Sequence, residues 1–255
     1  MNTDPAVAHS QGFTLVELAI VLVIVGLLLG GMLMPLGAQV EQRRVAETQK
    51  QLEDATQSLT GYAARNRSTP NNRPYLPCPD KTGGGGAGTA NDGQEDRNVN
   101  GTCAAVEGNL PWVTLGLNAN DVWGDRVRYR VDAGFSRSVE SGAGIGDDGF
   151  RLTPAPATVA ALRICSAANC PGGTVLATGI PAVIVSHGAN GYGSGLPKPA
   201  PPGTNTGELE NADGDNDFVQ RSAAPAGTPG GEFDDIISWL SPNVLINRMI
   251  SAGRL

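Results

Sequence analysis

Residues 13–36 read FTLVELAIVLVIVGLLLGGMLMPL, a run of 24 residues in which Glu17 is the only charged side chain. A helix rises about 1.5 Å per residue, so a run of this length can cross the ~30 Å hydrocarbon core of a bilayer. A removable secretory signal fits less well, because it has a shorter apolar region, a preceding basic region and a small-residue cleavage site. We therefore expect the run to be a membrane-spanning helical segment that stays on the mature protein.

Glu17 is the unusual residue of this run. A carboxylate inside a membrane segment costs about 2.5–3.5 kcal/mol on insertion scales. A cut after Gly12 would free the amino group of Phe13, four residues before Glu17, and an opposite charge offsets the desolvation of both groups. The alternative is an acid tolerated near the membrane interface, where the penalty is smaller.

The hexapeptide GFTLVE at residues 12–17, followed directly by the apolar run, resembles the type III signal of type IV pilins and type II secretion pseudopilins. The resemblance implies that prepilin peptidase removes residues 1–12 and that the new amino terminus, Phe13, is N-methylated. It also implies that Glu17 pairs with the amino terminus of a neighbouring subunit during assembly. The leader MNTDPAVAHSQG departs from the family, since it contains no Lys or Arg.

Residues 37–66 have a polar, helix-favouring composition with one apolar stripe. The stripe repeats every seven residues and comprises Val45, Leu52 and Leu59 with Thr48, Ala55 and Tyr62. Fewer than three full heptads argue against a coiled coil, so the spacing predicts an amphipathic helix with one buried face. A helix with its first half in lipid and its second half on a globular domain is the plan of the pilin family.

Residues 67–255 are expected to form the globular domain, with a small antiparallel β-sheet and long Gly- and Pro-rich loops. Alternating or buried apolar patterns predict strands, and a Ser-Pro pair predicts the start of a helix. The expected elements are strands in Asp125–Val131, Val159–Ile164 and Ala182–Ser186, a short element at Asp234–Leu240, and a helix from Ser241-Pro242. With Pro197–Gly207 and Ala223–Gly231 as inserted loops, the fold class is α+β.

Three short stretches of this domain resemble the major pseudopilin of type II secretion. They are DVWG at 121–124, AVIVSHGANG at 182–191 and FDDIISW at 233–239. Asn190 stands where that family usually has Asp, and residues 194–231 look like an insertion.

The four cysteines all follow the apolar run, and an even number in an exported, Gly-rich domain favours disulfides. Of the three possible pairings we favour the two that are local in sequence, Cys78–Cys103 and Cys165–Cys170. A zinc site of four thiolates is the alternative, although no C-x2-C spacing occurs.

Calcium is the one cofactor that the sequence suggests, at either of two places. Asp96, Asn98, Asn100 and Glu107 match the spacing of an EF-hand loop, although a chance match in an Asn- and Gly-rich loop explains them as well. The second place is a set of acidic residues, namely Asp213, Asp215, Asp217, Asp234 and Asp235. The related pseudopilin binds Ca²⁺ in its last loops, and solvated acids without a cation are the alternative.

The remaining composition argues against several classes of function. The net charge is −7 and no basic block occurs, which disfavours direct nucleic-acid binding. His9 and His187 are the only histidines, and His9 lies in the expected leader, so we do not expect an enzyme.

We therefore expect a minor pilin or pseudopilin of a type IV pilus or type II secretion system. Its partners would be other pilin subunits, prepilin peptidase and the inner membrane. The globular domain would lie in the periplasm and later in a pilus, in a pseudopilus or at the cell surface. The alternatives are a major pilin subunit and a membrane-tethered, calcium-dependent adhesion module.

Overall fold

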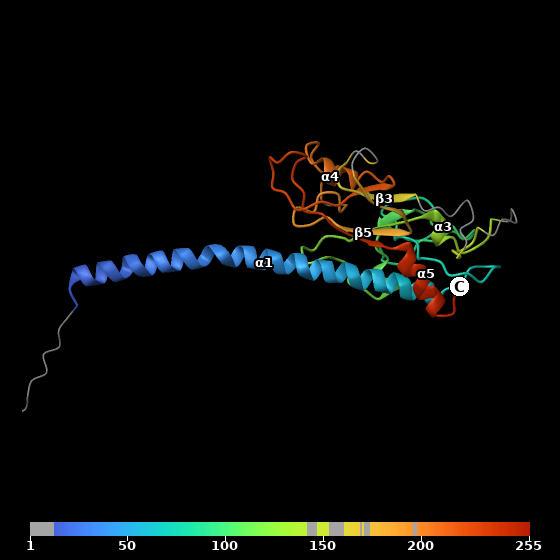
Figure 1. The fold of residues 1–255 in the computed structure, drawn as a ribbon, viewed down its shortest axis with the longest axis horizontal. Coiled ribbons are helices and arrows are strands. Elements are labelled where there is room, and N and C mark those ends of the chain that lie inside the picture. Colours follow the sequence, from blue (N-terminus) through green and yellow to red (C-terminus); the bar gives the residue numbers. More distant parts are fainter. Residues whose placement is uncertain (1–12, 142–146, 153–160, 169, 171–173, 196–197) are drawn as a thin grey trace, which may run out of the picture. The chain divides into compact units, whose positions relative to one another are not determined.

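Helix α1 extends over Leu15–Arg65, a length of 51 residues (Figure 1). The computed structural model describes residues 13–141, 147–152, 161–168, 170, 174–195 and 198–255, without the side chains of 29–36. The chain divides into two units, residues 1–43 and 44–255. The leader 1–12, with Gly12, lies outside the described residues.

In the first unit, the described part of α1 exposes an apolar surface. Every large apolar side chain from Phe13 to Leu28 is between 42% and 87% exposed. Within the part of the chain that the structure describes, no helix is both long enough and apolar enough to cross a membrane. The membrane span expected for residues 13–36 therefore stays a prediction.

The described residues of the second unit form an α+β domain with two sheets. Its strands are β1 (Glu107–Asn109), β2 (Arg128–Val131), β3 (Leu162–Cys165), β4 (Val175–Ile180), β5 (Ala182–Ser186), β6 (Asp217–Val219) and β7 (Ile236–Leu240). Its further helices are α2 (Trp112–Leu115), α3 (Ala133–Ser136), α4 (Thr206–Glu210) and α5 (Pro242–Ser251).

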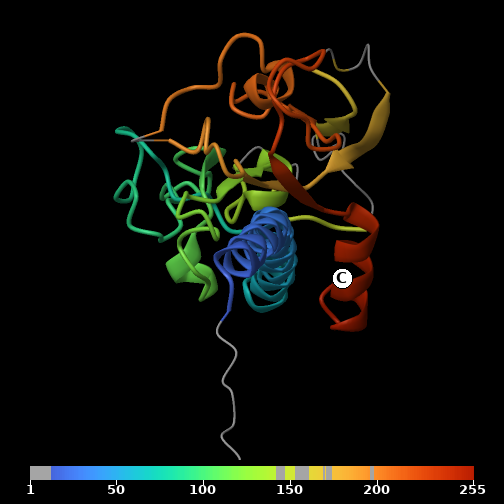
Figure 2. The ribbon, with the colours of Figure 1, turned by 90° about the vertical axis from the view of Figure 1, so that its left-hand side faces the viewer.

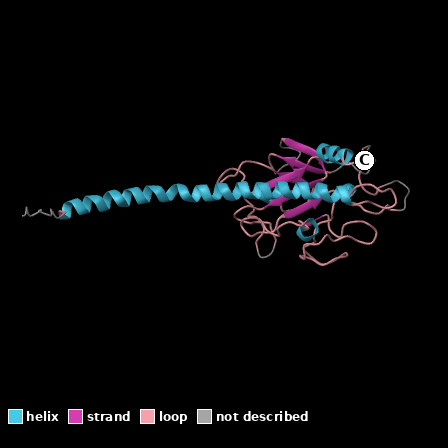
Figure 3. Cartoon of the chain, turned by 90° about the horizontal axis from the view of Figure 1, so that it is seen from below, coloured by secondary structure: helices cyan, strands magenta, loops and turns pink. Residues whose placement is uncertain are grey.

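The larger sheet has the order β1-β2-β5-β7 and is antiparallel throughout, as expected from the sequence. Seen from below, strands of the domain lie behind the second half of α1 (Figure 3). The smaller sheet has the order β4-β3-β6, and its β3 and β6 are parallel. The expected antiparallel sheet is therefore present, but the smaller mixed sheet was not predicted. The reason is that β6 lies in the segment taken as an insertion, where it pairs with β3 and Asp217 forms an ion pair with Arg163.

Strand β5 lies between the two hydrophobic cores, which explains why all five of its residues are buried. Ala182 and Ile184 pack in the core that contains the carboxyl-terminal part of α1. Val183 and Val185 face the opposite way and pack with residues of β3 and β6. Successive side chains of a strand point to opposite faces, so an uninterrupted apolar run suits a strand that is covered on both faces.

The amphipathic stripe of α1 is buried as the heptad spacing predicts. Thr48, Leu52, Ala55, Leu59 and Tyr62 are buried, whereas Val45 is only partly so. Helix α5 lies on the same side of the larger sheet as this part of α1, and α4 lies on the other side (Figure 2).

Helix α5 begins at Pro242, as expected, and buries Leu245 and Met249 in the core that α1 shares. We expected Ser241 to cap this helix, and it does occupy the N-cap position, but its side chain forms no capping hydrogen bond, so that expectation was wrong. The fixed φ of Pro242 still suits a first helical turn.

The structure contains both sequence-local disulfides, Cys78–Cys103 and Cys165–Cys170. The first joins the ends of the long loop that follows α1, and Cys78 is fully buried. The expected strand at Asp125–Val131 begins only at Arg128, and Val159 lies outside the described residues.

Candidate functional site

The start of α1 is closed by a reciprocal pair of side chains, Thr14 and Glu17. The Glu17 backbone N–H donates to Thr14 Oγ1 at 3.2 Å, while the Thr14 backbone N–H donates to Glu17 Oε2 at 3.0 Å. The Thr14 hydroxyl also donates to Glu17 Oε2 at 3.0 Å. This is a capping box, in which two backbone N–H groups at the helix start gain partners.

The capping box gives Glu17 a local role that the sequence reasoning missed. The signal was present as Thr14-x-x-Glu17 directly before an apolar helix, which is the sequence signature of the motif. Both side chains are exposed, so the carboxylate remains accessible to a cation from outside. Glu17 can thus cap its own helix and still meet an amino group.

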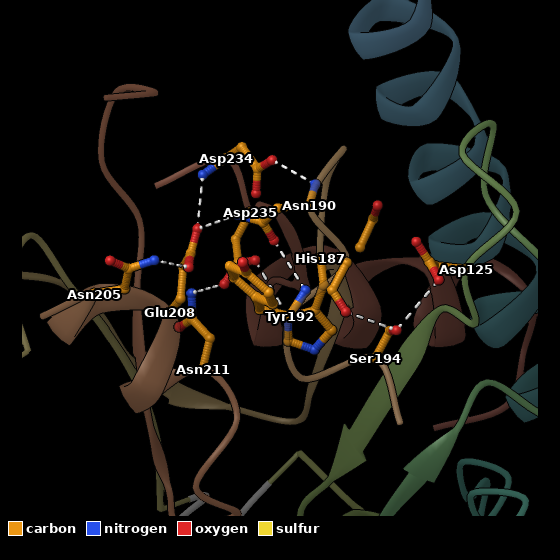
Figure 4. Close-up of polar contacts among 12 residues, drawn as sticks. Asp125, His187, Asn190, Tyr192, Ser194, Asn205, Glu208, Asn211, Asp234 and Asp235 are labelled. Carbon is orange, nitrogen blue, oxygen red and sulfur yellow. Dashed lines mark hydrogen bonds and ion pairs between the residues drawn. The ribbon is translucent and has the colours of Figure 1, made fainter. Parts of the chain in front are cut away.

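A second site lies where the loop 187–191, which follows β5, meets α4 and the residues just before β7 (Figure 4). Glu208, Asp234 and Asp235 offer carboxylate oxygens that all lie within 4.8 Å of one another. Hard oxygen ligands at this spacing suit Ca²⁺.

Both carboxylate oxygens of Glu208 accept hydrogen bonds from side-chain or backbone donors. Its Oε1 accepts from Asn190 Nδ2 at 2.9 Å and from the Asp234 backbone N–H at 3.3 Å. Its Oε2 accepts from Asn205 Nδ2 at 2.8 Å. The side chain is fully buried, so these donors replace the water that the carboxylate has lost.

Asp235 is anchored by His187 and Asn211. Its Oδ1 lies 3.2 Å from His187 Nδ1, and its Oδ2 accepts from Asn211 Nδ2 at 2.8 Å. The His187 side chain is fully buried, so this contact fixes the end of the loop that leaves β5.

Asp234 is the least satisfied of the three acids. Its Oδ2 accepts from the Asn190 backbone N–H at 2.9 Å, whereas its Oδ1 is buried without a hydrogen-bond partner among the described residues. Burial, and then the charges of Asp235, Glu208 and Glu232, raise the pKa of Asp234 to about 7. An unpartnered oxygen among converging acids fits a site for a cation.

Gly188 allows the loop to approach Asp234 closely. Its φ is +59°, and a Cβ at this position would lie 2.4 Å from the Asp234 backbone oxygen. Only a residue without a side chain fits there at low cost. The sequence HGANG therefore shapes the site by backbone approach.

The five acidic residues predicted as one cluster are divided by the structure. Asp215 and Asp217 converge with Glu210, again within 4.8 Å, while Asp234 and Asp235 converge with Glu208. Asp213 instead accepts the Asp215 backbone N–H at 3.0 Å. We call Glu210, Asp215 and Asp217 the outer acidic group. Burial and the neighbouring acids Asp215, Asp213 and Asp217 raise the pKa of Glu210 to about 7.

The residues that match an EF-hand pattern have other partners. Asp96 Oδ2 accepts from the Lys81 backbone N–H at 2.8 Å, and Asn98 Oδ1 accepts from the Ala87 backbone N–H at 3.0 Å. Asn100 Oδ1 accepts from the Thr102 hydroxyl at 2.7 Å. Glu107 forms ion pairs with Arg128 and Arg130 at 3.3 and 3.1 Å. The geometry therefore favours a hydrogen-bonded loop over a calcium loop.

Glu208 and Glu210 were not among the predicted ligands, although each completes one acidic group. Both belong to α4, in the part of the chain taken as an insertion. Their spacing in Gly207-Glu208-Leu209-Glu210 carries no metal-binding signature, so only the folded chain places them with acids further along.

Comparison with known proteins identifies the amino-terminal segment alone. Residues 8–33 match the family model of the prokaryotic N-terminal methylation motif. None of the curated proteins and none of the solved structures compared with the chain matched it. The matched residues include the capping box and the first turns of α1. The chain thus carries the prepilin-type signal of type IV pilins and pseudopilins, which indicates a pilin-like or pseudopilin substrate of prepilin peptidase.

Proposed function

We propose that the protein is a minor subunit of a type IV pilus or a type II secretion pseudopilus. Prepilin peptidase cuts it between Gly12 and Phe13, and residues 13–36 anchor it as a single-pass protein of the inner membrane. The globular domain lies in the periplasm. The subunit then leaves the membrane and polymerises through its amino-terminal helix.

The observation that carries this proposal is the methylation motif followed by an exposed apolar helix surface. Between Phe13 and Leu28 the large apolar side chains have no covering partner within the described chain, and Glu17 is the only charge. Such a surface needs either lipid or other apolar helices around it. A subunit that passes from membrane to filament meets both environments in turn.

The proposed role is structural rather than catalytic. His187, the only histidine after the leader, is fully buried and contacts Asp235. The nearby Ser194 hydroxyl donates to the Gly191 carbonyl oxygen at 2.9 Å and lies 3.4 Å from Asp125 Oδ1. This arrangement supports a positioning role for both side chains, because a nucleophile would need a hydrogen bond to its base.

Calcium binding at Glu208, Asp234 and Asp235 is a second candidate activity, supported by the unpartnered Asp234 Oδ1. Calcium would neutralise the buried carboxylates and so stabilise the loops around them. In a filament subunit this effect sets the stability of the outer domain. In a tethered adhesion module, the alternative role, it would also prepare a binding surface.

The test of the main proposal is the intact mass of the membrane-extracted protein from strains with and without prepilin peptidase. We expect the mature protein to lack residues 1–12 and to carry one added methyl group, both only when the peptidase is present. A Gly12→Val variant should remain uncut in both strains. A chain that begins at Met1 regardless of the peptidase would overturn the proposal.

A further inference from the structure

A polar cavity of about 420 Å³ opens between the Gly-rich loop after α1, the β1–β2 edge of the larger sheet and the loop 193–195. Thr82 and Asn91 line the cavity from the Gly-rich loop, and Asn109 and Arg128 line it from the edge of the sheet. Its volume lies within the ~300–1,000 Å³ that is usual for small-molecule sites. None of the acids in the two carboxylate groups described above lines it.

Arg126 gives this cavity a cation without an acidic partner. Its guanidinium lies 4.1 Å from the centre of the Trp112 ring. Of the carboxylates that the structure describes, none forms an ion pair with it. Stacking holds the planar group by its face and leaves its N–H edge available, which is the geometry for bidentate binding of a carboxylate.

Arg128 adds a second guanidinium to the cavity wall. It lies 3.3 Å from Glu107, but the same carboxylate also pairs with Arg130 at 3.1 Å. One negative charge is therefore shared between two positive ones. Asp80, behind the wall, is fully buried and accepts from Asn109 Nδ2 at 3.3 Å, which turns that amide's oxygen toward Arg128. The cavity surface is thus positive in a protein of net charge −7.

The remaining polar groups of the wall are uncharged. Thr82 and Asn91 are exposed and present a hydroxyl and an amide, whereas Ser194 is buried and its hydroxyl donates to the Gly191 carbonyl oxygen. The Asn91 amide is held at the wall, since its Oδ1 accepts from Asn109 Nδ2 at 3.0 Å and its Nδ2 donates to the Thr82 carbonyl oxygen at 3.4 Å, and its second N–H remains for a ligand. Such groups both donate and accept hydrogen bonds, so they suit the hydroxyl groups of a ligand. A simple inorganic anion would use the guanidiniums but not these side chains.

We propose that this cavity binds a hydroxylated carboxylate of about monosaccharide size, such as a hexuronate. The carboxylate binds to the edge of Arg126, with Arg128 as the supporting charge, and the hydroxyls bind to Asn91 and Thr82. The site is separate from the apolar helix and from the acidic groups, so it does not depend on the proposed role in a filament.

The experiment is isothermal titration calorimetry of the purified full chain in detergent with sodium galacturonate, galactose and inorganic phosphate. We expect galacturonate to bind at least about tenfold more tightly than galactose, because a charge-assisted bidentate contact is lost in the neutral sugar. Phosphate should bind more weakly than galacturonate. Equal binding of galactose, equal binding of phosphate, or no binding of galacturonate would each overturn the proposal.

Variants place the binding in this cavity. Arg126→Gln should weaken galacturonate binding at least about tenfold. Arg221→Gln is the matched control, since Arg221 also stacks on an aromatic ring, that of Phe233 at 4.8 Å, outside the cavity. If Arg126→Gln does not fold, Thr82→Glu tests the same site, because it adds a negative charge at an exposed wall position. Unchanged affinity in the folded variant would overturn the assignment.

Discussion

Glu17 has two separable roles at the level of single side chains. One is the capping of α1 with Thr14, which needs an oxygen acceptor but no charge. The other, which rests on the proposed function, is a charge pair with the amino terminus of a neighbouring subunit. A Glu17→Ala substitution removes both at once, so it does not distinguish the cap from the charge.

Glu17→Gln and Thr14→Val separate these roles. Gln keeps an acceptor for the Thr14 N–H and removes the charge, so we expect normal membrane levels but loss of incorporation into filaments. Thr14→Val removes the hydroxyl oxygen that accepts from the Glu17 backbone N–H, which costs about 1 kcal/mol of helix stability, and keeps the charge. We expect it to enter filaments. Immunoblots that compare sheared filaments with membrane fractions measure the incorporation of each variant. If Thr14→Val were absent from filaments while Glu17→Gln entered them, the assembly role of the charge would be contradicted.

The unpartnered oxygen of Asp234 leads to a prediction about calcium. Addition of Ca²⁺ in hundredfold excess over its dissociation constant should stabilise the protein by about 2.7 kcal/mol. Asp234→Asn should abolish this gain. It should also stabilise the calcium-free protein, because it removes a charge that lies buried beside Asp235 and Glu208. Thermal unfolding with Ca²⁺ and with chelator measures both effects.

Asp215→Asn is the control for this prediction, since Asp215 is exposed and belongs to the outer acidic group. It should leave the response to Ca²⁺ unchanged. If Asp215→Asn abolished the response and Asp234→Asn preserved it, calcium would be assigned to the outer group.

At the level of elements, α1 is fixed to the domain by the buried stripe of its second half. Leu59 is fully buried in the core that β5 and α5 share. Leu59→Ala should lower the free energy of unfolding by about 2–5 kcal/mol, because it removes apolar contacts and leaves a cavity. Urea unfolding of the full chain measures this, with the fully exposed Val99→Ala as a control that should change it by less than about 0.5 kcal/mol.

The elements that could be predicted from the sequence are those with a strong local pattern. The run Ala182–Ser186 is apolar because both faces of β5 are covered, and its bounds were predicted correctly. β4 was missed because most of its side chains are at least partly exposed, and Gly179 interrupts its apolar pattern. β6 has only three residues, too few for a periodicity.

The two candidate sites also differ in how far they could be predicted from the sequence. The signal around Glu17 is continuous in sequence, so it could be recognised directly. The second site needs His187, Glu208 and Asp235, which come from three separate stretches of the chain. Only tertiary structure brings them together, and no local pattern marks Glu208 as a partner.

At the level of the whole molecule, buried acids make stability depend on pH. Burial raises the pKa of Asp121 above its ordinary value of 3.8, so the folded protein holds that proton more tightly than the unfolded chain. Its contribution to stability is therefore full below pH 3.8 and is lost as the pH rises through the raised pKa. Burial raises the pKa of Asp80 and Asp132 in the same direction.

Asp121→Asn should reduce the loss of folding stability with rising pH, because the substituted side chain has no proton to lose. Asp121 Oδ1 accepts from the Trp123 and Asp125 backbone N–H groups, and Oδ2 accepts from the Ser186 hydroxyl at 2.6 Å. An Asn oxygen can keep the first two bonds, and its amide can donate to the Ser186 oxygen. Urea unfolding between pH 4 and pH 8 measures the slope. Asp54→Asn on the exposed face of α1 should keep the parent slope, and an unchanged slope in Asp121→Asn would contradict the prediction.

The capping box also determines what the processing enzyme encounters. All its groups belong to Thr14 and Glu17, downstream of the expected cut, so trimming the leader leaves the helix start intact. Phe13 and Thr14 precede the first helical residue, Leu15. On the side of Phe13, the expected scissile bond therefore adjoins non-helical backbone, which a protease can bind without first unwinding a helical turn. We therefore expect precursor and product to share one helix boundary, so that maturation would exchange an amide for a charged terminus without local refolding.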